Sequence, residues 1–329
     1  MSFNIKNNLY LSSFLLLVGS AAQATTLYVN CGAKTGLTTI NAAINAAQHS
    51  ESRSPTTINV SGACRENILV QNMDRVTINA LNGASITDAS DGAHEVIDIL
   101  NSKSFTLNGF TIVATCPSSC LTGAGTDGIS CYYGSDCLLI NNTVSGAENG
   151  AGIGVYSLSK AIVQGGLLRN NWAGLFTNDS GQMFALGVTS ENNSYGMYMN
   201  RGGTISFRAG ADGVTPTVIS HNSVQGIFAD IGATVVLKAP ADVSDNGAEG
   251  IFLGLGAKLF AGGGAVGVVS MTGNGSAGVR LRDLAIALFG RSAQVTGNKL
   301  PNVWCDAATA VTSNAIAAAG GAADTNCTN

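Results

Sequence analysis

The strongest constraint on the fold is a short motif, a glycine followed by an apolar residue, that recurs along the chain. It occurs at Gly128, Gly152, Gly174, Gly196, Gly226, Gly250 and Gly278. Successive glycines are 24, 22, 22, 30, 24 and 28 residues apart, which a unit of about 22 to 24 residues with occasional insertions explains. A period in this range indicates a solenoid of stacked units, so the repeat decides the fold.

Each unit also contains short apolar segments bounded by turn residues, such as MFAL at 183–186 and TVVL at 234–237. Three such segments in each unit are typical of strands, and strands this short need neighbouring units to bury a face. Asparagines recur in register at Asn142, Asn171, Asn193, Asn222, Asn246, Asn274 and Asn298. Amides stacked one coil apart can form a hydrogen-bonded ladder. We therefore predict an all-β fold, a parallel β-helix of about ten coils, roughly 50 Å long.

The two ends of the chain differ from the repeat. In TTINAAINAAQ the apolar residues follow the spacing of one helical face, formed by Ile40, Ala43, Ile44 and Ala47. We predict a short N-terminal helix that caps the first coil, because the end of a solenoid exposes an apolar floor. The predicted organisation is a signal peptide at 1–24, an N-terminal cap and first coils at 25–110, a repeat region at 111–303 and a C-terminal cap at 304–329.

The first residues have the features of a secretory signal. Lys6 precedes an apolar run from Leu9 to Val18, and the segment ends in Ala-Gln-Ala at 22–24, which is typical of a signal peptidase site. The apolar run is shorter than the roughly 20 residues that a membrane span needs. We expect a secreted or periplasmic protein without a transmembrane segment in its mature form.

Export permits disulfide bonds, and the eight cysteines form four groups that are close in the sequence. The expected pairs are Cys31 with Cys64, Cys116 with Cys120, Cys131 with Cys137, and Cys305 with Cys327. A zinc site made from the four central cysteines is the alternative, but it lacks the C-x2-C spacing of common zinc folds. We expect neither metal nor cofactor. A net charge of −4 excludes the basic surface that nucleic acid requires.

The glycine repeat and the opening TTINAAINAA, followed by INVSGACRENILV, resemble right-handed parallel β-helix repeat proteins of the pectin lyase-like superfamily. The opening is similar to that of pectin methylesterases, in which a cap helix precedes a G-x-x-x-E-N turn, here Gly62, Glu66 and Asn67. The resemblance implies a right-handed coil and a bias toward extracellular polysaccharides. It does not imply a mechanism, because one fold supports many functions.

The catalytic motifs of that superfamily are largely missing. The paired-aspartate segments of pectin methylesterases and the D-D and G-H-G motifs of polygalacturonases do not occur, and GTDGIS with Asp127 matches only in part. A hydrolase needs two carboxylates that face each other, so Asp127 is equally well explained as a turn residue. The segment DGAHEV lacks the D-P-H pattern of alginate epimerases. For a lyase-like enzyme the available bases and acidic ligands are Arg201, Arg280, Arg282, Asp179 and Asp230, and the catalytic residues remain unassigned.

In four units an aromatic residue follows the apolar one. Strand alternation turns these aromatic side chains outward in one row, formed by Phe176, Tyr198, Phe228 and Phe252. The next outward positions add polar side chains, from Asn178, Asn200, Asp230, Arg280 and Arg282. Aromatic and polar groups in this arrangement suit a sugar chain, and anionic sugars would seek the arginines.

We predict binding of an extracellular polysaccharide, with processing as an open extension. The alternative is a non-catalytic surface or adhesive scaffold, in which the aromatic row only stabilises neighbouring strands.

Overall fold

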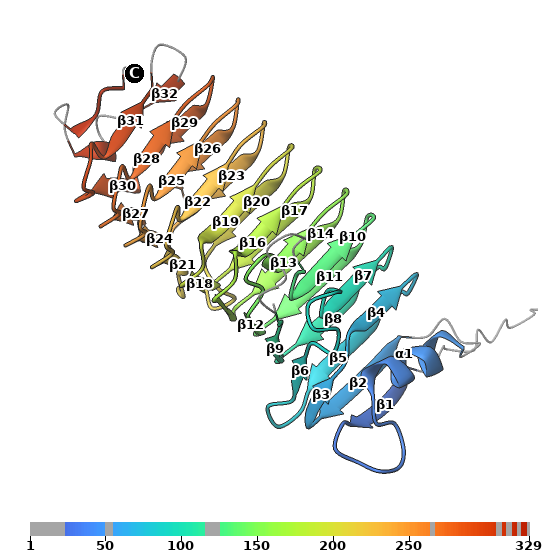
Figure 1. Cartoon of the computed structure of the whole chain (residues 1–329). Helices are drawn as coiled ribbons and strands as arrows, with labels where there is room; N and C mark the ends of the chain where they lie inside the picture. The colour runs from blue at the N-terminus through green and yellow to red at the C-terminus, as the bar shows by residue number, and fades with distance from the viewer. Residues whose placement is uncertain are drawn as a thin grey trace, which may run out of the picture.

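In the computed structural model the chain winds into one stack of coils that runs from the N-terminal helix to the C-terminal strands (Figure 1). The structure describes residues 24–49, 55–115, 126–263, 267–306, 311–313, 318–320 and 324–327. The predicted signal peptide, except Ala24, and the predicted pair Cys116–Cys120 lie outside these residues.

Each coil contributes one strand to each of three parallel sheets. Sheet A contains β1 (Thr25–Asn30), β2 (Thr56–Ser61), β5 (Val76–Ala80), β8 (Phe105–Asn108), β11 (Asp136–Ile140), β14 (Lys160–Gln164), β17 (Gln182–Leu186), β20 (Thr204–Arg208), β23 (Thr234–Leu237), β26 (Lys258–Ala261), β29 (Ile286–Phe289) and β32 (Val311–Ser313). Sheet B contains β3 (Ala63–Arg65), β6 (Ser85–Thr87), β9 (Thr111–Val113), β12 (Thr143–Ser145), β15 (Leu167–Arg169), β18 (Thr189–Glu191), β21 (Thr217–Ser220), β24 (Ala241–Ser244), β27 (Val269–Thr272) and β30 (Ala293–Thr296).

Sheet C contains β4 (Ile68–Gln71), β7 (Ile97–Leu100), β10 (Ile129–Tyr132), β13 (Ala151–Val155), β16 (Ala173–Thr177), β19 (Tyr195–Met199), β22 (Ile227–Ala229), β25 (Ile251–Leu253), β28 (Val279–Leu281) and β31 (Val303–Cys305). The predicted parallel β-helix of about ten coils is therefore confirmed.

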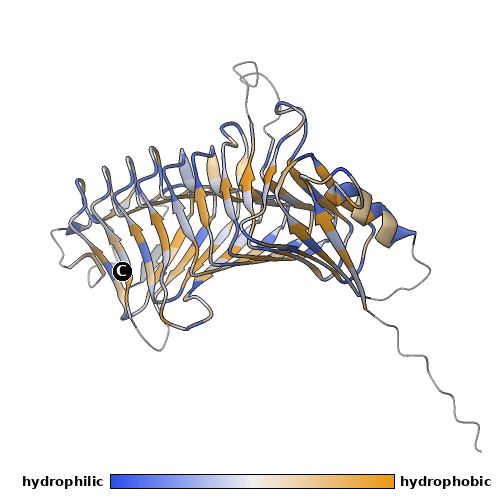
Figure 2. Cartoon of the chain, turned by 90° about the horizontal axis from the view of Figure 1, so that it is seen from below, coloured by the Kyte–Doolittle hydropathy of each residue, from blue (hydrophilic) through white to orange (hydrophobic). Residues whose placement is uncertain are grey.

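The core is a set of apolar columns that run along the inside of the coil. In sheet C, for example, Ile153, Leu175 and Met197 pair in register on successive strands, and each is almost completely buried. Burial alternates along most strands because neighbouring side chains point to opposite faces. The hydropathy colouring shows the same pattern, with apolar strands between more hydrophilic turns (Figure 2).

The predicted asparagine ladder is present at the corner between sheets B and C. The Nδ2 atom of Asn193 donates to Oδ1 of Asn222 at 3.1 Å, and Asn222 donates to Asn246 at 2.9 Å. The ladder runs through Asn171, Asn193, Asn222, Asn246, Asn274, Asn298 and Asn302. The repeated glycine lies beside it. A Cβ atom on Gly226 would come within 2.6 Å of both Asn246 Nδ2 and the Gly250 carbonyl oxygen, so glycine is required there.

Asn142 does not belong to the ladder, contrary to the sequence prediction. It lies between β11 and β12, at the corner between sheets A and B. There its Oδ1 accepts a hydrogen bond from the Phe110 backbone N–H and its Nδ2 donates to the Leu107 carbonyl. Both corners carry an asparagine after a short strand, so spacing alone did not separate them.

The helix α1 (Ile40–Gln48) covers the first coil, as predicted. Its buried face contains Ile40, Ala43 and Ile44. Two backbone N–H groups of its first turn, those of Ile40 and Asn41, donate to the Glu66 carboxylate at 2.7 and 3.0 Å. These groups have no partner within the helix, and a carboxylate also suits the positive end of the helix dipole. The glutamate of the G-x-x-x-E-N turn therefore holds the cap in place.

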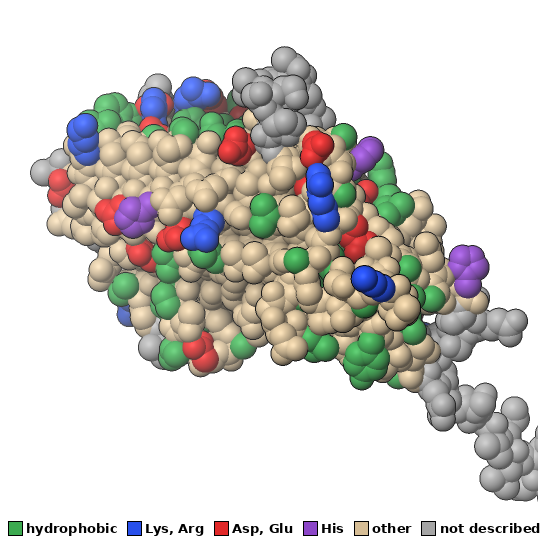
Figure 3. Space-filling model, turned by 60° about the horizontal axis from the view of Figure 1, so that its bottom comes forward, with side chains coloured by type: hydrophobic (Ala, Val, Ile, Leu, Met, Phe, Trp, Pro, Cys, Tyr) green, Lys and Arg blue, Asp and Glu red, His purple; other side chains and the backbone are tan. Residues whose placement is uncertain are grey.

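Three of the predicted disulfide bonds are present, namely Cys31–Cys64, Cys131–Cys137 and Cys305–Cys327. Disulfides are typical of proteins that fold in an oxidising compartment. Within the described ranges, none of the helices has the length and hydrophobicity of a membrane span. On the face shown in Figure 3, charged side chains are sparse, and blue and red groups often lie side by side.

Candidate functional site

The four predicted aromatic residues form a continuous stack on the outer face of sheet C. Phe176, Tyr198, Phe228 and Phe252 pair in register on successive strands. Their ring centroids are 5.6, 4.7 and 5.1 Å apart, and neighbouring rings are inclined by 24°, 16° and 7°. The predicted row is confirmed as geometry. Because the ring faces cover one another along the rod, they present edges rather than faces to a ligand, and Phe252 is only 7% exposed.

Two further aromatic residues widen the stack at its centre. Trp172 lies 4.8 Å from the Tyr198 ring, and Tyr195 meets Tyr198 edge-on at 5.2 Å. Both residues come before the glycine of their units, whereas the sequence prediction considered only aromatic residues that follow it. Edge-to-face contacts of this kind add stability beyond the area they bury.

The stack continues toward the N-terminus through a residue that the repeat does not indicate. Gly154 occupies the position in register with Phe176, and a Cβ atom there would overlap the ring of Tyr156. The Tyr156 ring fills this space and lies 5.3 Å from Phe176 and 4.3 Å from Tyr132, with which it is parallel to within 9°. The aromatic column is therefore Tyr132, Tyr156, Phe176, Tyr198, Phe228 and Phe252.

A buried carboxylate lies at the N-terminal end of this column. Asp127 is 3% exposed, and its Oδ2 accepts hydrogen bonds from Tyr156 Oη at 2.6 Å and Ser130 Oγ at 2.9 Å. Its Oδ1 accepts the Ala151 backbone N–H at 2.7 Å. The sequence explained Asp127 equally well as a turn residue, and in the structure Tyr156 connects its carboxylate to the aromatic row two coils away. We call Glu95, Asp98, Asp127, Tyr132 and Tyr156 the tyrosine–carboxylate cluster.

The cluster shifts the pKa values of its own members. Burial raises the pKa of Asp127 to about 6, although its three hydrogen bonds act in the opposite direction. Burial also raises the pKa of Asp98 to about 6, helped by the negative charges of Glu95 and Asp127. Burial and the charge of Asp127 raise the pKa values of Tyr132 and Tyr156 above the ordinary tyrosine value. The tyrosines therefore hold their protons at neutral pH, while the two aspartates titrate close to it.

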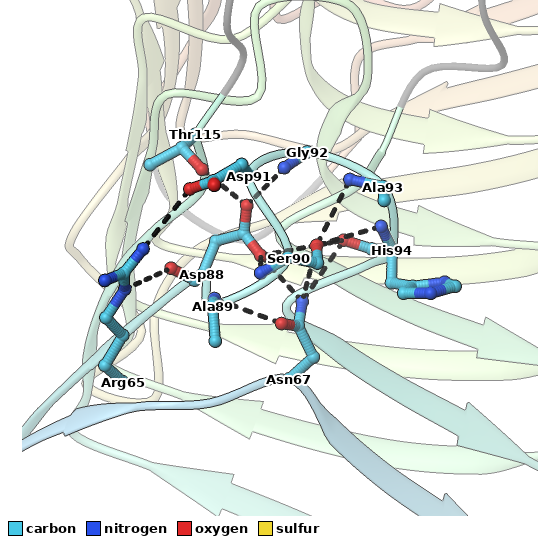
Figure 4. A network of polar contacts seen from close by, with 10 residues as sticks. All are labelled: Arg65, Asn67, Asp88, Ala89, Ser90, Asp91, Gly92, Ala93, His94 and Thr115. Atoms are coloured by element: carbon cyan, nitrogen blue, oxygen red, sulfur yellow. Dashed lines mark hydrogen bonds and ion pairs between the residues drawn. The ribbon is translucent and has the colours of Figure 1, made fainter.

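A neighbouring network fixes the loop that carries Glu95, between β6 and β7 (Figure 4). The buried Asp88 accepts the backbone N–H groups of Ser90 at 2.8 Å and Gly92 at 2.6 Å. Burial acts to raise the pKa of Asp88, but hydrogen bonds from Thr115, Ser90 and Asn67 outweigh it and hold this pKa well below its usual value. Asn67 also donates to the Glu95 carbonyl at 2.9 Å. The network explains why DGAHEV forms an ordered turn, and Glu95 lies beside the cluster as a result.

The predicted polar row shapes a turn between sheets C and A. Side-chain oxygens of Asn178, Asn200 and Asp230 each accept the backbone N–H of the next residue, at 2.9, 2.8 and 2.9 Å. Those next residues have φ values of 47°, 44° and 45°, a left-handed conformation that L-residues seldom adopt. These local hydrogen bonds explain why an amide or carboxylate side chain occurs at each of the three turn positions.

The predicted arginines are paired with carboxylates. Arg280 continues the aromatic column after Phe252, where it lies 2.8 Å from Asp306 and 3.3 Å from the buried Glu249. The hydrogen bond to Asp306 raises the Arg280 pKa, which is the reverse of what a catalytic base needs. Arg282 contacts Asp283 at 2.7 Å and lies over the Phe252 ring.

The remaining lyase-type candidates are also paired with each other. Arg201 lies 3.7 Å from Asp179, and both side chains are about half exposed or more. This pair sits at the corner turn after sheet C and does not reach the tyrosine–carboxylate cluster through any hydrogen bond among the described residues.

Comparison with known proteins agrees with the architecture. Residues 95–262, just over half of the chain, match the family described as right handed beta helix region. The chain therefore belongs to the right-handed β-helix family, and the predicted right-handed parallel β-helix fold is confirmed. No curated protein matches the sequence.

Two solved structures from Azotobacter vinelandii align with this chain. The A-module of mannuronan C-5 epimerase AlgE6 aligns with a TM-score of 0.53 at 12% identity, over 83% of this chain and 88% of that chain. The A-module of mannuronan C-5 epimerase AlgE4 aligns with a TM-score of 0.47 at 10% identity, over 83% and 89%. At these identities the likeness concerns the fold alone.

Proposed function

We propose that this protein is exported, binds an extracellular polysaccharide across sheet C and processes it at the tyrosine–carboxylate cluster. The observation that carries the proposal is the hydrogen bond from Tyr156 to the buried Asp127, next to the stacked Tyr132. Hydroxyl groups that keep their protons beside carboxylates that titrate near pH 6 form an arrangement suited to proton transfer. The similarity in fold to a protein described as a mannuronan C-5 epimerase supports a polysaccharide as the substrate.

In this proposal the residues have separate roles. Tyr132 donates a hydrogen bond to the sugar chain, and Tyr156, whose ring stacks on Tyr132, donates its hydroxyl to Asp127 and so positions both groups. Asp98 is the proton acceptor, because burial and the charges of Glu95 and Asp127 raise its pKa to about 6. The edges of the aromatic column give the sugar chain an apolar surface beyond the cluster.

Export is supported by the A-x-A site at residues 22–24 and by the three disulfide bonds. Both features fit a secreted or periplasmic protein.

The test compares Tyr156→Phe and Asp127→Asn with Tyr28→Phe, a matched control on the exposed side of sheet A, where Tyr28 is 67% exposed. Each mature protein is incubated with neutral and uronate-containing polysaccharides. New reducing ends, absorbance of unsaturated sugars and the sugar stereochemistry are then measured. We expect turnover of one polymer by the unmodified and control proteins, and a loss of about 100-fold or more in the two cluster variants. Equal turnover by all four proteins would refute the proposal.

A non-catalytic scaffold is the second candidate, and one observation favours it. The rings of Tyr198, Phe228 and Phe252 cover one another's faces, as expected if the column serves to hold the coils together. This candidate predicts neither retention on any polysaccharide nor turnover in the same assay.

A further inference from the structure

The outer side of sheet C carries an excess of negative charge. The carboxylates on or beside the aromatic column, or at the turn that follows sheet C, are Glu95, Asp98, Asp127, Asp179, Asp230, Glu249, Asp283 and Asp306, whereas the cations there are Arg201, Arg280 and Arg282. Asp230 lies close enough to Tyr198 to raise its pKa, in addition to the effect of burial. Like charges repel over several ångströms in a partly buried site. This excess of negative charge therefore disfavours anionic ligands relative to neutral ones.

Each of these cations is already paired with a carboxylate, and Arg201 lies 3.7 Å from Asp179. Arg280 lies between Asp306 and Glu249 at 2.8 and 3.3 Å, and Glu249 also accepts hydrogen bonds from Gln225 and Ser276. Arg282 contacts Asp283 at 2.7 Å. A uronate that sought any of these guanidinium groups would have to displace a protein carboxylate at close range. The arginine end is therefore poorly suited to anionic sugars, contrary to the expectation from the sequence.

The cluster end lacks a neutralising group in the described part of the chain. The charged groups that act on Asp98 are Glu95 and Asp127, both of them carboxylates, and their effect adds to that of burial. A uronate ring placed here would add a further negative charge to a site of like charge, at a cost that grows as water is excluded.

Hydrogen-bonding capacity leads to the same conclusion. The cluster contains three carboxylates, those of Glu95, Asp98 and Asp127, but only two hydroxyl groups, those of Tyr132 and Tyr156. A sugar hydroxyl supplies a donor, whereas a uronate carboxylate adds two acceptors and no proton at neutral pH. Neutral sugars therefore complement the site, and uronates do not.

We propose that the polysaccharide bound on sheet C is an uncharged glycan, which is recognised by hydrogen bonds from its hydroxyl groups to the cluster carboxylates and by contact with the edges of the aromatic column. This inference rests on the proposed function and names its substrate class.

The experiment measures retention of the mature protein on two neutral polymers, galactomannan and xylan, and on two anionic polymers, polygalacturonate and alginate. Each polymer is tested at about 50 mM and about 500 mM NaCl, because salt screens exposed charges, with EDTA and then with calcium. We expect retention on a neutral polymer that changes less than about two-fold with salt, and none on the polyuronates.

Retention on a polyuronate alone, with or without calcium, would overturn the inference while leaving the proposed function intact. Absence of retention on all four polymers would overturn both.

Variants that remove negative charge test whether electrostatic repulsion is the reason that the face rejects polyuronates. Asp98→Asn combined with Asp230→Asn removes two negative charges from the face, and Asp242→Asn removes one from β24 on sheet B as the matched control. At low salt we expect the double variant to gain at least about five-fold in polyuronate retention, an effect that disappears at high salt. The control should show no gain. A double variant that still rejects polyuronates would show that charge is not the reason, and would overturn the electrostatic argument.

Discussion

The two ends of the aromatic column on sheet C each contain a buried carboxylate, and they satisfy it in different ways. Glu249, at the C-terminal end, is neutralised by Arg280, which Asp306 holds from the other side. Asp127, at the N-terminal end, accepts hydrogen bonds from hydroxyl and N–H groups only. A cation fixes the charge of a carboxylate, whereas neutral donors leave it able to titrate. In the proposed function, the C-terminal end of the column therefore serves stability and the N-terminal end serves proton transfer.

The largest expected effect separates the two ends by activity. Asp127→Asn should lower turnover by about 100-fold or more, because it replaces the titratable carboxylate that accepts the Tyr156 hydroxyl with a neutral amide. Glu249→Gln should change turnover by less than about five-fold, since Glu249 contacts Arg280 and not the cluster. The measurement is the initial rate of turnover of the polymer on which the protein is retained. Similar losses of turnover in both variants would show that the two ends of the column do not differ in their contribution to activity.

The free energy of unfolding should depend more on the C-terminal end of the column, where Arg280 and Glu249 form an ion pair. Arg280→Met leaves the buried Glu249 without its cation, and should lower the free energy of unfolding by about 1–3 kcal/mol, less than for a fully buried pair because Arg280 is partly exposed. Arg282→Met, which breaks an exposed pair, should cost about 0.5 kcal/mol or less. Urea unfolding of both variants gives the comparison. Equal shifts would mean that Glu249 does not depend on Arg280.

The free energy of unfolding should depend on pH in a way that reflects the raised pKa of Asp98 in the cluster. The folded-state pKa of Asp98, about 6, lies above its ordinary value of 3.8, so its contribution to stability is present below that ordinary value and is lost as the pH rises through 6. Asp98→Asn should therefore make the fall in stability between these values shallower by about 1–2 kcal/mol. Urea midpoints at a series of pH values test this. A profile unchanged by the substitution would contradict the raised pKa.

Asp88 serves as a control for this pH profile, because its pKa is shifted in the opposite direction to that of Asp98. Its pKa lies below the ordinary value in the folded protein, so its stabilising effect is present above that ordinary value and is lost on acidification. Asp88→Asn should leave the profile above pH 5 parallel to that of the unmodified protein, and should flatten the acid limb.

The smallest effect concerns the aromatic stack itself. Phe228→Leu removes two stacked contacts, with Tyr198 and Phe252, and should cost about 1–2 kcal/mol, since each ring pair contributes about 0.5–1.5 kcal/mol beyond area. Leu69→Ala, on the outer face of β4 at the far end of sheet C, serves as the control and should cost less. Thermal or urea unfolding measures both. A smaller loss for Phe228→Leu would mean that the rings are neighbours without mutual stabilisation.

The sequence predicted the coil, the cap helix, the asparagine ladder and the stacked aromatic row, because each depends on a period that can be counted. It did not predict the role of Tyr156, because the ring of this residue fills the space above Gly154, two positions earlier. A glycine at the expected aromatic position, followed by a tyrosine, was the available signal. The partners of Arg280 were also missed, since Glu249 and Asp306 are 31 and 26 residues away and meet it only through the register of the coils.

The central claim is that a glycan chain meets this protein at the tyrosine–carboxylate cluster on sheet C. A crystal structure of the mature protein with a bound neutral oligosaccharide tests it most directly. The account predicts a sugar hydroxyl within hydrogen-bond distance, about 3 Å, of Asp98 or Tyr132, with the sugar chain following the aromatic column. A sugar bound instead on sheet A or sheet B, with sheet C unoccupied, would contradict it.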